Sequence, residues 1–94
     1  MATFIMLGSY SSDALREMSA QRTENARNII KKFGGEIVSM YALLGEIDLI
    51  LIVNLPGIEE AVKASVSLTK ATDIAFSTSA ALSVDQFDKL TAEL

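Results

Sequence analysis

The amino-acid sequence predicts an α+β fold in which helices pack on an antiparallel sheet. Three observations lead to this prediction. Apolar segments of strand length alternate with helical segments in the order β-α-β-β-α-β, glycine and proline separate the segments, and one more helix follows at the end. The 94 residues suffice for a single domain, taken as residues 1–94, and the 50% hydrophobic composition can fill its core.

The first strand and the first helical segment come before a pair of glycines. Residues 3–9 are apolar and predict a strand. Gly34-Gly35 ends the helical segment 11–33, as glycine commonly does after a helix. The pattern leaves open whether this segment is one helix or a short helix followed by a longer one. Residues spaced by three or four positions lie on the same face of a helix. In this segment they are Leu15, Met18, Arg22, Ala26, Ile29 and Phe33.

A hairpin is predicted next, with strands at 36–42 and 47–54 joined by the turn 43–46. Simple alternation along the first of these strands directs one set of side chains to one face and the other set to the opposite face. The first set is Ile37, Ser39 and Tyr41, and the second is Val38 and Met40.

The last three elements follow Pro56-Gly57, which ends the third strand. Residues 58–71 predict a helix, and residues 73–80 predict a fourth strand. A final helix begins near Ser83, which has capping-box spacing to Gln86. The order is that of the ferredoxin-like fold with an extra C-terminal helix. The apolar face expected for helix 58–71 contains Ile58, Ala61, Val62, Ser65, Val66, Leu68 and Thr69.

The third strand is apolar on both faces, because Leu51 and Val53 point to one side and Ile50 and Ile52 to the other. Two helices can cover only one face of such a sheet, and soluble monomers rarely expose a large apolar patch. We therefore expect a homodimer or a higher homo-oligomer formed through the sheet face, the arrangement called a dimeric α+β barrel. In the alternative, the C-terminal helix folds back over this face within one chain. That helix could also support the partner or build a larger ring.

Composition and charge exclude several classes of function. The net charge of −4, the pI of about 4.6 and the lack of a basic stripe argue against nucleic-acid binding. The chain has neither cysteine nor histidine, so thiolate chemistry, histidine bases and the usual zinc sites are excluded. We expect no cofactor and no metal. No segment has the pattern of a signal peptide or a membrane span, so a cytoplasmic protein without a membrane partner is expected.

Three polar residues stand out as candidate lining of a small-molecule site. Asp48 enters a strand among aliphatic side chains, where a carboxylate needs hydrogen bonds or a cation. It is either a cleft carboxylate or a residue that binds nearby backbone N–H groups. Arg22 lies on an apolar helix face and can lie along that face or pair with Asp48 or Glu36. Tyr41 can present its hydroxyl to the same pocket or pack as an ordinary strand residue.

The segment "RNIIKKFGGEIVSMYALLGEIDLILIVNLPGIEEA" resembles the GYD-domain family over much of the chain. The family pattern has paired glycines, a strand ending in an aromatic residue, Gly-x-Tyr-Asp, an apolar strand and a proline. Three positions depart from it: Ile47 replaces the tyrosine of the motif, Ala42 a frequent tryptophan and Asn54 a common acidic residue. The matching residues are Gly34, Gly35, Tyr41, Gly45, Asp48 and Pro56, with Arg22 where the family tends to have arginine.

The resemblance implies a ferredoxin-like fold and oligomerisation more than it implies an activity. The function we expect is that of a homo-oligomeric protein that binds a small molecule or has a structural or regulatory role. The alternative is a cofactor-independent enzyme, similar to the oxygenases and isomerases among dimeric α+β barrels. Such an enzyme would use Asp48 or Glu46 as its base, with Arg22 or Tyr41 stabilising charge.

Overall fold

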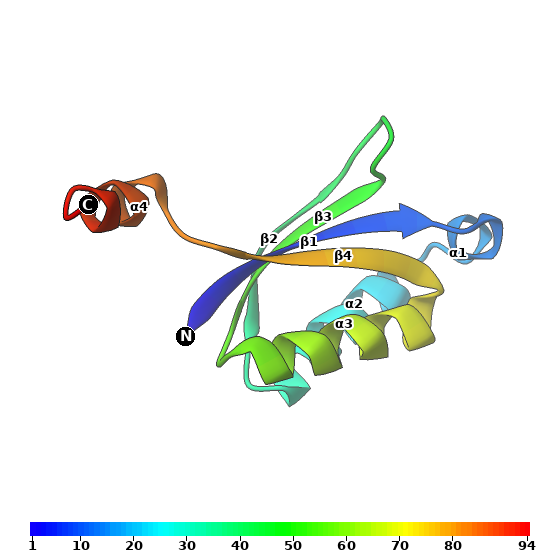
Figure 1. Ribbon diagram of the computed structural model, residues 1–94. Helices are drawn as coiled ribbons and strands as arrows, with labels where there is room; N and C mark the ends of the chain where they lie inside the picture. Colours follow the sequence, from blue (N-terminus) through cyan, green and yellow to red (C-terminus); the bar gives the residue numbers. More distant parts are fainter.

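The computed structural model describes residues 1–94 and confirms the predicted order of strands and helices (Figure 1). The predicted C-terminal helix is also present. The elements are β1 (Ala2–Tyr10), α1 (Ser12–Arg16), α2 (Ala20–Lys32), β2 (Glu36–Ala42), β3 (Leu49–Leu55), α3 (Ile58–Thr72), β4 (Ile74–Ala81) and α4 (Val84–Thr91).

The four strands form one antiparallel sheet in the order β2-β3-β1-β4, so β1 and β3 are central and β2 and β4 are edges. Helices α2 and α3 lie side by side on the same face of this sheet (Figure 1). This is the ferredoxin-like α+β arrangement that the sequence predicts.

The hydrophobic core lies between the sheet and these two helices. Every second residue of the central strands points into it, because side chains alternate across a strand. Burying one such side chain contributes roughly 1.5–3 kcal/mol, so these contacts are a main source of the stability of the fold. The largest fully buried side chains are Met6, Ile30, Leu51, Val53, Leu55 and Leu68.

The first helical segment is broken, which settles the question that the sequence leaves open. The Ser11 hydroxyl accepts a hydrogen bond from the backbone N–H of Ala14 at 2.9 Å and begins α1. The Ser19 hydroxyl accepts one from the N–H of Arg22 at 3.1 Å and begins α2. The prediction that one helix face runs through residues 11–33 is therefore wrong in its first part, where Leu15 and Met18 are exposed.

Helix α2 ends at the predicted glycines. Gly34 has φ of 83°, a conformation that glycine adopts without steric cost. Its N–H donates to the carbonyl of Lys31 and that of Gly35 to the carbonyl of Ile30, which is the Schellman arrangement. Gly35 lies so close to β3 that an added Cβ would come within 2.3 Å of the Asn54 carbonyl oxygen.

A β-bulge at Val38 corrects the side-chain directions predicted for β2. Ile37 pairs with Val53 and Ser39 pairs with Ile52, so Val38 has no partner across the ladder. The extra residue reverses the alternation, and Ile37 therefore packs on the core together with Met40.

The face that α3 buries matches the prediction at Ala61 and Leu68 and differs from it at Val62 and Val66. The small side chains of Ala61 and Ala64, with Leu68, lie against the sheet and let the helix approach it closely. The larger Val62 and Val66 are about half exposed beside the sheet edge, at 57% and 51%.

Two strands begin later than predicted. Strand β4 begins at Ile74, because Asp73 is the left-handed cap of α3, with φ of 59° and its N–H donating to the Thr69 carbonyl at 2.8 Å. Strand β3 begins at Leu49, although the Asp48 N–H still donates to the Gly8 carbonyl at 3.0 Å.

Helix α4 stands apart from the rest of the chain. The Ser83 hydroxyl accepts a hydrogen bond from the N–H of Gln86, which confirms the predicted cap. No residue of α4 is buried. The helix continues outward from the end of β4 and does not cover the sheet (Figure 1). Of all the helices, none combines the length and apolar character needed to cross a membrane.

Candidate functional site

The face of the sheet turned away from α2 and α3 is uncovered, and we call it the open face (Figure 1). Two rows of directly paired residues cross it, each with one residue from every strand. In both rows the two central residues are aliphatic and the two edge residues have hydroxyl groups. The rows are Ser39–Ile52–Ile5–Ser79 and Tyr41–Ile50–Leu7–Ser77.

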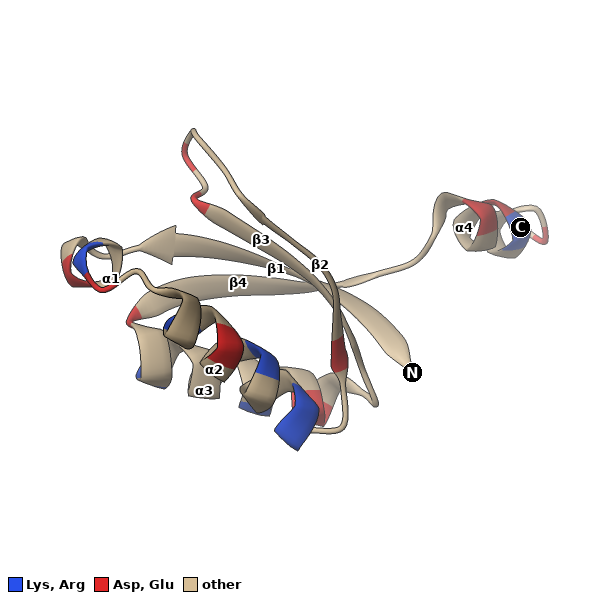
Figure 2. Cartoon of the chain, turned by 180° about the vertical axis from the view of Figure 1, so that it is seen from behind, with Lys and Arg blue, Asp and Glu red and all other residues tan.

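The open face has almost no charge. The only charged residue within the four strands is Glu36, at the start of β2. Figure 2 shows that lysine, arginine and most acidic residues lie on the helices and loops instead. A surface with an aliphatic centre and an uncharged, hydroxyl-bearing margin has the composition of a protein interface core with a polar rim.

A third row closes one end of the open face with polar groups. The Thr3 hydroxyl donates to the Asn54 side-chain oxygen at 2.9 Å, and the Asn54 amide nitrogen donates to a Glu36 carboxylate oxygen at 3.3 Å. Asn54 therefore links β1 and β2 through β3. Glu36 therefore pairs with Asn54. It does not pair with Arg22, which was one of the partners considered from the sequence.

The Asp48 side chain binds one backbone N–H group, in line with one of the two interpretations of the sequence. Its carboxylate accepts a hydrogen bond from the backbone N–H of Tyr10 at 2.9 Å. Its own N–H and carbonyl are paired with Gly8 and Leu43. Two of these contacts fix the turn between β2 and β3 against the end of β1, and the third closes the turn itself.

Arg22 contacts the same corner of the molecule from the helix side. Its guanidinium donates to the Ala14 carbonyl in α1, which lacks a partner within that short helix. It also lies over the Tyr10 ring, 5.6 Å from the ring centroid. Arg22 therefore joins α1, α2 and the end of β1, and it forms no ion pair with Asp48.

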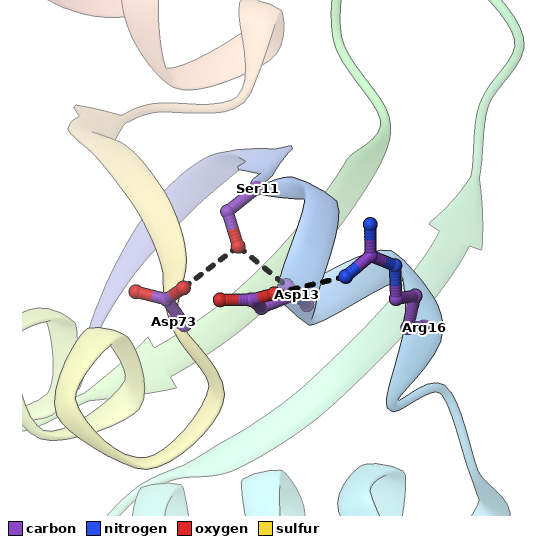
Figure 3. A network of polar contacts seen from close by, with 5 residues as sticks. Ser11, Asp13, Arg16 and Asp73 are labelled. Atoms are coloured by element: carbon purple, nitrogen blue, oxygen red, sulfur yellow. Dashed lines mark hydrogen bonds and ion pairs between the residues drawn. The ribbon is translucent and has the colours of Figure 1, made fainter.

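Further polar contacts complete this corner. The Ser11 hydroxyl that caps α1 also donates to the Asp73 carboxylate at 2.7 Å, as Figure 3 shows. Asp13 and Arg16 form an ion pair at 3.5 Å on the surface of α1. Both side chains of this ion pair are largely exposed, so it adds little stability.

The three predicted site residues are thus not gathered into one pocket. Arg22 and Asp48 both contact Tyr10, but Tyr41 lies at the edge of the open face with 58% of its surface exposed. Glu46 is exposed in the turn between β2 and β3. Tyr10 links Arg22 with Asp48 and was not among the predicted site residues, because partners far apart in the chain leave no local pattern.

Three hollows lie on the helix side of the sheet, and one of them, beside Val66 and Lys70, continues the largest. A small cavity of about 50 Å³ lies beside Arg22 and Tyr10. A larger groove of about 400 Å³ runs between α3 and the edge strand β4, and we call it the α3 groove. In the sequence, the repeat of Ile58, Val62 and Val66 marks this groove. The repeat was interpreted there as the face of the helix that packs on the core. The α3 groove is lined by Phe4, Ile58, Ala61, Val62, Ser65, Val66, Phe76, Thr78 and Ala80.

The model of the GYD domain family matches residues 4–91, which is nearly the whole chain. The chain therefore belongs to the GYD domain family. Comparisons with curated proteins and with solved structures found no match. The family assignment agrees with the antiparallel α+β fold.

Proposed function

We propose that this GYD domain protein works as a homo-oligomer whose open faces pair across a two-fold axis. The observation behind the proposal is the pair of rows in which aliphatic residues of β1 and β3 lie between hydroxyl-bearing residues of β2 and β4. Left in water, the central side chains Ile5, Leu7, Ile50 and Ile52 would form a contiguous apolar surface.

Pairing of two open faces removes this surface from water. Because each chain presents the same face, a two-fold dimer is the simplest closed assembly. A stable interface of this kind buries on the order of 1,600 Å² in total, about half from each chain. The near absence of charge on the strands means that pairing leaves no carboxylate or ammonium group unpaired at the centre.

We further propose that the paired sheets hold a small, largely apolar molecule at the margin of the interface. Tyr41, Ser39, Ser77 and Ser79 would supply hydrogen bonds there, while the aliphatic centre excludes water. Of the three residues first considered for a site, only Tyr41 belongs to this surface. The cysteine-free chain suits a reducing compartment, and a cytoplasmic location is part of the proposal.

An enzyme has less support as the function. General base catalysis needs the base within hydrogen-bond reach of the proton it removes. The Asp48 carboxylate is engaged with the Tyr10 N–H, and Arg22 with the Ala14 carbonyl. Neither residue is free beside Tyr41 on the open face.

A charge placed at the centre of the open face tests the proposal. Ile52→Asp puts a carboxylate where the aliphatic residues would meet, and we expect the molar mass by light scattering to fall below that of the unmodified protein. Asn28→Asp is the matched control, because it adds the same charge at an exposed site on α2. Equal masses for the two variants would refute pairing through the open face.

A further inference from the structure

Helix α4 has an apolar side that nothing in its own chain covers. Val84, Phe87 and Leu90 recur every three residues and are each more than half exposed. Leu94 continues this side beyond the end of the helix and is fully exposed. An amphipathic helix with this spacing is the form in which helices bind apolar grooves.

Helix α4 also needs a surface to pack against in order to be stable. The helix has eight residues and none of them is buried. Isolated helices shorter than roughly 12–15 residues are marginal in water, and helices in proteins gain most of their stability from packing an apolar face. The Ser83 cap stabilises the first turn only.

The α3 groove is an apolar surface of matching size. From Ile58 to Val66 it follows α3 for about 12 Å, and the stripe from Val84 to Leu90 is about 9 Å long, at 1.5 Å per residue. Seven of the nine residues that line the groove are hydrophobic. Its volume of about 400 Å³ leaves room for several side chains.

Charges beside the two surfaces are complementary. Asp88 and Glu93 flank the apolar side of α4, one turn from Val84 and Leu90 respectively. Lys70 lines the hollow that continues the α3 groove past Val66. Lys63 lies on the outer side of α3, one turn before Val66. Asp88, on one margin of the apolar side of α4, can therefore face lysines along the outer rim of the α3 groove.

Helix α4 stands away from the α3 groove of its own chain. Only Leu82 and Ser83 separate β4 from α4, and the helix continues away from its own α3 groove (Figures 1 and 2). The radius of gyration is 14.2 Å, against about 12 Å for a compact chain of this length. The excess reflects a segment that stands off the folded body.

We propose that α4 of one chain binds in the α3 groove of a second copy. Val84, Phe87 and Leu90 fill the groove, and Asp88 lies toward Lys63 and Lys70. This contact uses the helix side of the sheet and is separate from pairing of the open faces. Combined with that pairing, it would join dimers into a ring or a larger assembly, because a contact between two different surfaces is not self-limiting.

Disulfide trapping tests this contact cleanly, because the chain contains no cysteine. Full-length Val62→Cys and Phe87→Cys chains are mixed and oxidised, and the heterodisulfide is identified by mass. With one cysteine in each chain, a disulfide between positions 62 and 87 must join two molecules. Glu24→Cys, exposed on α2, replaces Val62→Cys in the matched control mixture. We expect at least about fivefold more heterodisulfide with Val62→Cys than in the control, because docking raises the effective concentration of the two thiols.

Two results would overturn the proposal. One is an equal yield of heterodisulfide in the two mixtures. The other is a disulfide within one chain of the Val62→Cys/Phe87→Cys double variant, since it would mean that α4 occupies its own α3 groove.

Molar mass of the unoxidised samples separates this proposal from pairing of the open faces. A dimer that gives no excess of the heterodisulfide overturns α4 binding and leaves the pairing of the open faces standing. An excess of the heterodisulfide, together with an Ile52→Asp variant whose molar mass equals that of the unmodified protein, supports α4 binding and refutes that pairing.

Discussion

Ile5 on β1 and Ile52 on β3 lie directly opposite each other at the centre of the face that no helix covers. The same row ends in Ser39 on β2 and Ser79 on β4. Apolar residues thus occupy the middle of the open face and hydroxyl groups its margins. This gradient from centre to edge is the basis for proposing that two sheets pair.

The gradient predicts unequal effects of truncation along one row. Ile5→Ala removes apolar contact at the centre of the proposed interface and should raise the dimer dissociation constant at least about tenfold. Ser79→Ala, in the same row at the margin, should change it less than about threefold. Sedimentation equilibrium measures both constants, and equal effects of the two substitutions would contradict the proposed interface.

Asp48 is expected to stabilise the fold. Asp48→Ala leaves the Tyr10 N–H without its acceptor, and the free energy of unfolding should fall by about 1–2 kcal/mol. Asp48→Asn should lose less, because the amide oxygen can still accept the bond. Urea denaturation measures both losses. An unchanged unfolding midpoint for Asp48→Ala would mean that this hydrogen bond contributes nothing.

Arg22 is expected to hold α1 in place. Arg22→Met keeps an apolar stem but removes the hydrogen bond to Ala14 and the cation over Tyr10. Amide hydrogen exchange in α1 should then be faster, while exchange at the centre of β1 and β3 stays as in the unmodified chain. Uniform acceleration across the sheet would instead indicate that Arg22 acts on global stability.

Gly35 is expected to tolerate no side chain. In Gly35→Ala the new Cβ would clash with the Asn54 carbonyl oxygen and with Leu55, and the unfolding free energy should fall by at least about 2 kcal/mol. Gly57→Ala is the matched control, since its Cβ would meet only the flexible end of Glu60. Its cost should stay below about 1 kcal/mol in the same thermal or urea melts.

Much of the fold follows from local patterns in the sequence. Gly34-Gly35 and the pair Ser83 and Gln86 set helix ends through contacts within a few residues, and both were predicted correctly. The two apolar faces of β3 were equally readable, because side chains alternate regularly along that strand.

The errors fall where packing or long-range contacts decide the structure. The bulge at Val38 reverses the faces of β2, and no local pattern marks it. Helix α3 turns its alanines to the sheet and leaves Val62 and Val66 outside, although the valines are the more hydrophobic side chains.

The contacts of two candidate site residues could not be predicted for the same reason. The partners of Arg22 and Asp48 lie 8 and 38 residues away along the chain. Their contacts become apparent only once β1 and the helices have come together.

The most direct test of pairing through the open face is the molar mass of the unmodified protein by light scattering, diluted stepwise into the low micromolar range. Pairing of the open faces predicts a dimer of twice the 10.1 kDa chain mass, or a multiple of that dimer, which persists on dilution. A species of 10.1 kDa at every concentration would contradict it, because the open face would then have no second chain to cover it.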